Sequence, residues 1–300
     1  KQYGLSGFCF YHYWFEGKLL LEKPIENLLK DKTIDFPFCL SWANENWTRR
    51  WDGKDKEVLI GQKHSLEDDS KHIEYLLKFF KDKRYIKVDN KPVLLIYRPE
   101  LIKQVKDTIH LWNEKAKRAG FSGVYFINME STPKSKGNGL KEDGFDAAMD
   151  FQPNWGNLPR SRKQSRLSRG LKRYLGIPYR STYHIDRVMS YEEYVDNEKF
   201  NFQKNPYKTY PTVVPSWDNS ARRKTKAFIF HGSTPKLYGK WLDFVLKKFK
   251  PYSEEENFVF INAWNEWAEG NHIEPCEKWG YKYLEETKQI IKINELHEFN

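Results

Sequence analysis

Short apolar runs that end in polar and aromatic residues recur along this chain and constrain its fold more than any other feature. The last run, Phe258–Ile261, has the composition of a buried strand and leads into Trp264-Asn265-Glu266-Trp267-Ala268-Glu269-Gly270. Earlier runs of this kind begin near Leu5, Phe36, Pro92, Val124, Phe145 and Thr212. Polar residues gathered after strand ends are typical of the carboxyl-terminal face of a (β/α)8 barrel, where such folds keep their chemistry.

Segments with helical periodicity alternate with these strands and predict a parallel α/β fold. Helices are expected at 24–30, 66–80, 105–119, 191–195, 237–249 and 281–293. Together with the polar residues after the strand ends, this alternation predicts a (β/α)8 TIM-type barrel that forms a single domain over residues 1–300. Such a barrel has eight strands and only seven are counted here, so we expect that its first strand is lacking. A doubly wound open sheet is the competing prediction. It should carry a G-x-G-x-x-G turn after its first strand, and the sequence has none.

Cysteine usage and apolar run length bear on the setting of the protein. The three cysteines, Cys9, Cys39 and Cys276, have neither the pattern of a disulfide framework nor zinc-site spacing. They favour a reducing cytoplasm, and no metal or cofactor is predicted. No apolar run approaches the roughly 20 residues that a membrane helix needs.

A basic segment interrupts the pattern around residues 160–180. Arginines and leucines recur there at helical spacing: Arg162, Arg166, Leu167, Arg169, Leu171, Arg173 and Leu175. This insertion either meets an anionic membrane surface or a lipid-linked diphosphate acceptor, or is a solvated helix on a long loop. With the formal net charge of +10, the first alternative places the protein at the periphery of the inner membrane. No nucleic-acid motif accompanies the segment, so no nucleic-acid partner is predicted.

Aromatic residues make up 16% of the chain, and many of its 11 tryptophans stand beside polar residues. Flat apolar faces next to hydrogen-bonding groups suit sugar rings; the alternative is that these tryptophans cap the barrel ends. The candidate substrate-binding residues all lie at or just after strand ends: Tyr11, His12, Tyr13, Trp14, Trp42, Asn44, Glu45, Trp47, Arg49, Trp51, Asp52, Asn128, Asp150, Trp155, Trp217, Trp264, Asn265, Trp267 and Glu274.

Two of these positions admit more than one interpretation. His12 either acts as a general base or hydrogen-bond donor, or only orients its neighbours. Arg49 and its neighbour Arg50 either clamp an anionic group or pair with Glu45 and Asp52 as loop scaffolding.

Glu266 and Glu269 are the candidate catalytic residues. A spacing of three, where a strand end turns helical, directs both carboxylates towards one site. Two acids in different environments can divide proton transfer, because one stays ionised while the other holds a proton. Glycosidic bond cleavage needs this division. The alternative is that one acid is catalytic and the other is structural.

Three blocks of the sequence resemble the signature blocks of the WbsX-like proteins, which are associated with O-antigen and other surface polysaccharide synthesis in bacteria. They are residues 7–15, 42–53 and 263–275, and the resemblance extends over essentially the whole chain. That group is similar to glycoside hydrolase family 99, the endo-α-mannosidases and endo-α-mannanases, mainly in the Trp-Asn-Glu-Trp-x-Glu-Gly block. Members usually carry an amino-terminal strand with an aromatic loop that this chain lacks, and Ala268 stands where family 99 often has a bulkier or polar residue.

The resemblance implies a (β/α)8 barrel and a retaining mechanism without metal. One glutamate deprotonates the sugar 2-hydroxyl, which attacks the anomeric carbon, and a second acts as acid and then base. By position, Glu266 is the implied 2-hydroxyl base and Glu269 the implied acid/base. Tyr11, Tyr13 and Trp47 are implied to line the sugar subsites.

Two enzymatic functions follow as expectations. The first is a retaining glycosidase-type enzyme acting on α-linked, manno-configured oligo- or polysaccharide of the bacterial surface. The alternative is a metal-independent glycosyltransferase in surface polysaccharide assembly; the chain has no Asp-x-Asp motif of the metal-dependent kind. A carbohydrate-binding module without activity is a third class, and the presence of both glutamates argues against it.

Overall fold

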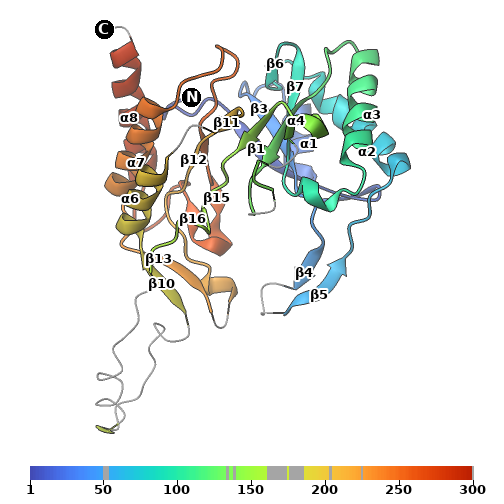
Figure 1. Ribbon diagram of the computed structural model, residues 1–300. Helices are drawn as coiled ribbons and strands as arrows, with labels where there is room; N and C mark the ends of the chain where they lie inside the picture. The colour runs from blue at the N-terminus through green and yellow to red at the C-terminus, as the bar shows by residue number, and fades with distance from the viewer. Residues whose placement is uncertain are drawn as a thin grey trace.

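The computed structural model describes residues 1–49, 54–132, 135–137, 140–160, 174–175, 186–202, 205–223 and 226–298. It is a mixed α/β fold built around a parallel sheet. Helices α1, α2 and α3 lie on one side of the molecule and α6, α7 and α8 on the opposite side, with the strands between them (Figure 1).

The central sheet begins with five parallel strands in the order β1, β3, β7, β8 and β9. Their bounds are β1 Phe8–Phe15, β3 Phe38–Trp42, β7 Lys91–Ile96, β8 Tyr125–Met129 and β9 Ala147–Met149. The order follows the chain, as expected when each parallel pair is joined by a crossover segment. In the register His12 lies opposite Trp42, Trp42 opposite Ile96, and Ile96 opposite Asn128. The carboxyl ends of these strands therefore lie together.

The next strand changes partners at Pro211, which has no N–H to donate. Its first part, β11 (Thr209–Tyr210), pairs with β9, and its second part, β12 (Thr212–Val213), pairs with β14 (Phe260–Ile261). The seven strand regions expected from the sequence are thus confirmed. The expectation that the last of them is a strand buried on both faces is wrong, because β14 is two residues long and only half-buried.

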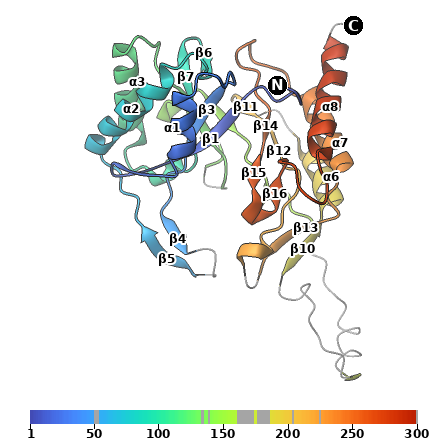
Figure 2. The same cartoon turned by 180° about the vertical axis from the view of Figure 1, so that it is seen from behind.

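The central sheet also includes β2 Lys18–Leu20, which pairs antiparallel with the end of β1, and β6 Lys87–Val88, which pairs antiparallel with β7. The other short strands pair outside this sheet: β4 Trp47–Arg49, β5 Lys54–Ile60, β10 Arg187–Ser190, β13 Phe228–His231, β15 Asn265–Glu266 and β16 Asn271–His272. The β4–β5 hairpin, the β10–β13 pair and the β15–β16 hairpin lie towards the same end of the molecule in both views (Figures 1 and 2).

The helices correspond to the periodic segments of the sequence. Their bounds are α1 Lys23–Lys30, α2 Leu66–Phe80, α3 Val105–Arg118, α4 Leu140–Asp143, α6 Tyr191–Asn201, α7 Pro235–Lys248 and α8 Lys282–Glu298. Side-chain oxygens begin three of them: Ser65, Ser190 and Thr234 accept the N–H of the residue three positions on. Such caps satisfy backbone donors that a helix leaves free at its start.

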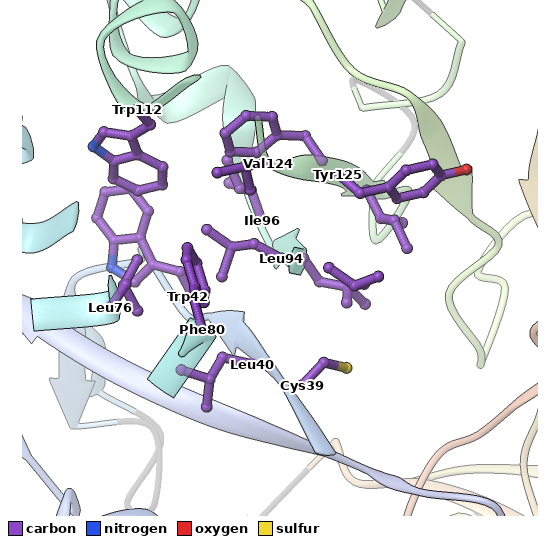
Figure 3. Packing of buried hydrophobic residues seen from close by; sticks show 14 of the residues in the cluster. Cys39, Leu40, Trp42, Leu76, Phe80, Leu94, Ile96, Trp112, Val124 and Tyr125 are labelled. Carbon is purple, nitrogen blue, oxygen red and sulfur yellow. The ribbon is translucent and has the colours of Figure 1, made fainter. Parts of the chain in front are cut away.

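The larger core lies between the sheet and helices α2 and α3. Trp42 and Trp112 are fully buried with ring centroids 5.7 Å apart, and Leu40, Leu94 and Phe80 pack around them (Figure 3). Full burial of each such aliphatic or phenyl side chain stabilises the fold by roughly 1.5–3 kcal/mol. This core fixes the first half of the sheet, from which several candidate site residues project.

Between β14 and β1 the described residues form no strand ladder, so closure of a barrel is not seen. An apolar cavity of about 190 Å³ lies beside this seam, lined among others by Leu5, Phe8, Trp264 and Leu284. The amino-terminal residues run across to α8, where Tyr3 stacks on Tyr281 with centroids 6.0 Å apart.

The basic segment predicted around residues 160–180 lies outside the described residues, apart from Arg160, Tyr174 and Leu175. Among the helices that are described, none combines the length and the apolar character that crossing a bilayer requires.

Candidate active site

The two candidate acids stand on one tight turn. Glu266 ends β15, and residues Trp267–Glu269 form a single 3-10 turn that connects to β16. Glu266 flanks the turn with φ −80° and ψ 66°, and Glu269 is its last residue, so the two acids stand three positions apart on one short loop. Gly270 ends the turn at φ +56°, the left-handed region that favours glycine. The two acids are thus neighbours in the connection between β15 and β16.

A second loop, residues 216–222, is hydrogen-bonded to this turn. The Asp218 N–H donates to the Glu269 carbonyl at 2.6 Å, and the Ser216 hydroxyl donates to the Gly270 carbonyl. A Cβ on Gly270 would come within 2.9 Å of the Asp218 carbonyl oxygen. The absence of a side chain at Gly270 therefore allows the two loops to touch.

This second loop brings a cation to the acids. Arg222 places Nη2 2.6 Å from Oε1 of Glu269, and the two side chains are 30% and 17% exposed. Burial raises the pKa of Glu266, while the charge of Arg222 acts in the opposite direction. Sequence reasoning missed Arg222, because one arginine among 51 lysines and arginines carries no distinguishing signal.

Strand β1 supplies two tyrosines to the same region. Burial raises the pKa of Tyr13, the charge of Glu266 raises it further, and Arg222 lowers it. Burial also raises the pKa of Tyr11, with smaller contributions that include Glu269. Tyr11 is 40% exposed as a whole residue, while protein surrounds its hydroxyl closely. The first strand and the acidic turn thus lie within electrostatic reach of each other.

Aromatic rings continue from these tyrosines along the carboxyl ends of the strands. Tyr13 stacks on Trp47 with centroids 5.6 Å apart, and Tyr11 meets the edge of Tyr97 at 6.3 Å. Tyr97 in turn meets Phe151 at 5.7 Å. Tyr97 and Phe151 were not among the expected site residues, although both stand directly after predicted strands, the same signal that identified Tyr11 and Tyr13.

Four expected substrate-binding residues are buried away from the acids. Side chains alternate along a strand, so His12 and Trp14 face helix α2 while Tyr11 and Tyr13 face the other way. Nε2 of His12 lies 2.8 Å from Nε2 of His72, and the Trp14 indole donates to Asp68 at 2.9 Å.

Trp42 is fully buried in the core, and its indole donates to the Trp14 carbonyl. Asn44 is also fully buried, with its side chain bonded to the backbone N–H and carbonyl of Arg98, both at 2.8 Å. The expectation that His12, Trp14, Trp42 and Asn44 bind substrate is therefore corrected.

The indole-rich loop after β3 is described in part. Glu45 forms an ion pair with Arg98, which also holds Glu100 at 2.6 Å. The expected pairing of Glu45 with Arg49 or Arg50, and the roles of Trp51 and Asp52, lie outside the described residues, as does the side chain of Arg49.

A separate polar group follows β8 and β9. Burial raises the pKa of Asp150, which accepts the side-chain N–H of Gln152 at 3.3 Å. Asn128 is buried and donates to the Ser135 carbonyl at 2.8 Å, so it holds the following loop. Trp155 is 42% exposed and meets the edge of the buried Trp217 at 5.9 Å.

The remaining candidates surround the acidic turn. Trp267 is 47% exposed, stacks on His272 with centroids 3.7 Å apart, and donates to Glu274 at 2.7 Å. Asn265 is exposed in β15. Trp264 contacts Phe8 at the start of β1 and lines the apolar cavity, so it belongs to the seam.

Across the parts of the chain that the structure describes, no three His, Cys, Asp or Glu side chains gather closely enough to hold a metal ion.

A family model described as Glycosyltransferase WbsX matches residues 1–287 of this chain. Two curated proteins from two strains of Xanthomonas campestris pv. campestris, both called Uncharacterized protein WxcX, are 35% identical over 292 residues. The match covers 97% of this chain and 40% of each relative. The chain therefore spans about two fifths of the length of the curated relatives it matches.

Two solved structures share the fold. A glycoside hydrolase-like protein superposes with a TM-score of 0.57 at 14% identity, covering 96% of this chain and 82% of that one. The GH99 endo-alpha-mannosidase from Bacteroides thetaiotaomicron superposes with a TM-score of 0.51 at 15% identity, covering 96% and 75%.

Proposed function

Because the chain belongs to the WbsX glycosyltransferase family, we propose that it is a carbohydrate-active enzyme of bacterial surface polysaccharide metabolism. Its substrate is an α-linked, manno-configured oligo- or polysaccharide, and its chemistry is of the retaining glycosidase type. The observation that carries the proposal is the placement of Glu266 and Glu269 on one turn within electrostatic reach of Tyr11 and Tyr13.

The arrangement supports glycosidic chemistry in two ways. The rings of Tyr13, Trp47, Tyr11 and Tyr97 offer flat faces to the C–H surfaces of sugars, with hydroxyl groups at their rims. The two carboxyl groups differ in environment, since Glu266 is half-buried with no ion pair to any described residue, while Glu269 is bound to a guanidinium. Such a difference lets one carboxyl group carry a proton while the other stays ionised.

Transfer to an acceptor is the second candidate function, favoured by the family description as a glycosyltransferase. A retaining active site hydrolyses when water is the acceptor and transfers when another hydroxyl takes its place. A lipid-linked acceptor at an anionic membrane surface of the cytoplasm suits this alternative.

We further propose that the sheet closes into a (β/α)8 barrel when an eighth strand occupies the seam between β14 and β1. Both neighbours of the seam run parallel in their own pairs. Because β2 covers only Tyr13–Phe15 of β1, the residues Phe8–His12 have one strand edge without a ladder partner among the described residues, and such an edge presents unpaired backbone groups. The apolar residues beside the seam, Leu5, Phe8, Trp264 and Leu284, offer a surface for such a strand. Two structures that share the fold, one called a glycoside hydrolase-like protein and the other a GH99 endo-alpha-mannosidase, support this proposal.

The test incubates the protein with α-mannans, or with sugar nucleotides and a lipid-linked acceptor, and follows products by mass spectrometry. Glu266→Gln and Glu269→Gln are expected to lose turnover while keeping the circular dichroism and melting temperature of the wild type. Glu277→Gln is the matched control, because Glu277 is exposed eight residues after Glu269, in the turn beyond β16. Near wild-type turnover by either active-site variant would refute the proposed chemistry. Turnover of a sugar nucleotide without hydrolysis of any glycan would select the transferase.

A further inference from the structure

The residue opposite Glu266 in the β15–β16 hairpin is a fully buried asparagine. Glu266 pairs with Asn271 in the antiparallel register, and Asn271 has no exposed surface. Residues that lie opposite each other in such a pair project to the same face, with Cβ atoms about 4.5–5.5 Å apart. The amide of Asn271 can therefore reach the Glu266 carboxyl group by rotation about side-chain bonds.

The Asn271 amide has no hydrogen-bond partner among the described residues. Its Nδ2 donor and its Oδ1 acceptor are both buried and both unpaired. Burying an unpaired donor or acceptor costs free energy, so most buried amides in proteins are hydrogen-bonded. Asn44 shows the usual arrangement, because it is equally buried and its amide bonds the N–H and the carbonyl of Arg98, both at 2.8 Å. A departure from this rule is expected at a functional site, where another requirement outweighs stability.

Glu266 lies on the same face and also lacks hydrogen-bond partners. Its carboxyl group is half-buried, and no residue that the structure describes donates a hydrogen bond to it. Arg222 from the second loop and Tyr13 from β1 interact with it only electrostatically. A carboxyl group that exchanges a proton needs a donor opposite it when ionised and an acceptor when protonated. A primary amide carries one of each side by side, so the unpaired groups of Asn271 match both states of Glu266.

We propose that Asn271 is a positioning residue for Glu266, donating from Nδ2 to the carboxylate and accepting at Oδ1 from the protonated acid while bound sugar excludes water. This inference rests on the proposed function, and it holds for whichever proton Glu266 transfers. Because Asn271 is fully buried, it acts through Glu266 and does not touch the sugar. Loss of its amide should therefore lower kcat and leave KM unchanged.

The first test replaces the amide with an apolar group of similar shape. Asn271→Leu removes two unpaired polar atoms, so its melting temperature should equal or exceed that of the wild type. Asn44→Leu is the matched control. It should melt about 4 °C or more below the wild type, because it leaves the Arg98 N–H and carbonyl without their partners. A fall of that size in Asn271→Leu would show that the amide is structural and would overturn the inference.

The kinetics of the same variant separate positioning from substrate binding. The substrate is α-mannan, or a sugar nucleotide with a lipid-linked acceptor if the wild type uses those. Asn271→Leu should lower kcat about 10-fold or more while KM changes less than about 2-fold. An unchanged kcat would overturn the inference, and so would a raised KM with kcat unchanged, because that result makes Asn271 a binding residue.

A third test needs no substrate. Protein labelled with δ-carbon-13 glutamate is titrated by NMR, and the Glu266 signal is identified by its loss in Glu266→Gln. Asn271→Asp places a second carboxyl group opposite Glu266, which should raise the Glu266 midpoint by about 1 pH unit or more. Asn265→Asp makes the same change on the other, exposed face of the hairpin and should raise the midpoint less than about half as much.

The titration also keeps this inference separate from the proposed function. Equal shifts in the two aspartate variants, or no shift in Asn271→Asp, would show that Asn271 does not face Glu266 and would overturn the inference. If the wild type turns over neither glycan nor sugar nucleotide, the proposed function fails, and the titration still decides whether the two side chains face each other.

Discussion

Replacing Gly270 by alanine tests whether contact between the two loops shapes the acidic turn. Gly270 adopts φ +56°, and a Cβ there would lie 2.9 Å from the Asp218 carbonyl oxygen and 3.0 Å from the Asp218 Cβ. The loop that carries Arg222 would have to move away from Glu269. Both stability and the ion pair are therefore expected to suffer.

The magnitude has two parts. Left-handed backbone costs a residue with a Cβ roughly 1–2 kcal/mol, and forcing an extra methyl group into a packed site costs typically 1–3 kcal/mol. Gly280→Ala isolates the first part, because Gly280 has φ +53° and nothing within 4 Å of its would-be Cβ. We expect Gly270→Ala to lose about 2–5 kcal/mol and Gly280→Ala about 1–2 kcal/mol.

Urea denaturation followed by fluorescence gives both values, and carbon-13 titration of Glu269 reports on the ion pair. In domains of 150–250 residues each kcal/mol lowers the melting temperature by roughly 2–4 °C, so thermal melts offer a second readout. If Gly270→Ala is no less stable than Gly280→Ala, and Glu269 titrates as in the wild type, the loops do not depend on their close approach.

Three further predictions concern other parts of the molecule. Burial lowers the pKa of His12 to about 3 and also lowers the pKa of His72. Only the unfolded chain therefore gains these two protons below about pH 6.5, and the free energy of unfolding falls as the pH drops. Between pH 6.5 and 5 the His12→Leu/His72→Leu variant should lose about 3 kcal/mol less than the wild type, and equal losses in urea denaturation would contradict this. Arg84→Met should cost about 3–5 kcal/mol in the same assay, since it removes the buried cation from Asp82 and the donors from three backbone carbonyls, leaving Asp82 the exposed Lys32 and a backbone N–H; a loss below about 1 kcal/mol would contradict it. Trp47→Ala should raise the Kd of an α-manno-oligosaccharide about 2- to 10-fold by calorimetry, and an unchanged Kd would remove this ring from the site.

Much of the fold was predictable because strand and helix patterns depend on local composition. All seven strand regions and the main helices lie where apolar periodicity places them, and Ser65 begins α2 as its sequence indicates. The length and burial of β14 were not predictable, because they depend on which strands flank it rather than on its own apolar residues. Closure of the sheet into a barrel likewise depends on pairing between strands that are far apart in sequence, which local composition does not encode.

The position of a residue at a strand end predicted that it lies near the candidate site, but it did not predict which way its side chain points. The sequence pattern singles out Tyr11, His12 and Tyr13 equally, yet alternation along β1 turns His12 towards α2. Trp42 has a polar sequence neighbourhood and is nevertheless core, since α2 and α3 cover it. The approach of Arg222 to Glu269 joins loops 47 residues apart in sequence, which no local pattern encodes.

The most direct test of the central claim is a crystal structure of the Glu266→Gln/Glu269→Gln protein soaked with an α-manno-oligosaccharide. We expect a sugar ring against Tyr13 and Trp47, with its 2-hydroxyl and glycosidic oxygen within hydrogen-bond distance of the two replaced side chains. A sugar bound elsewhere, with residues 266 and 269 not touching it, would contradict the account.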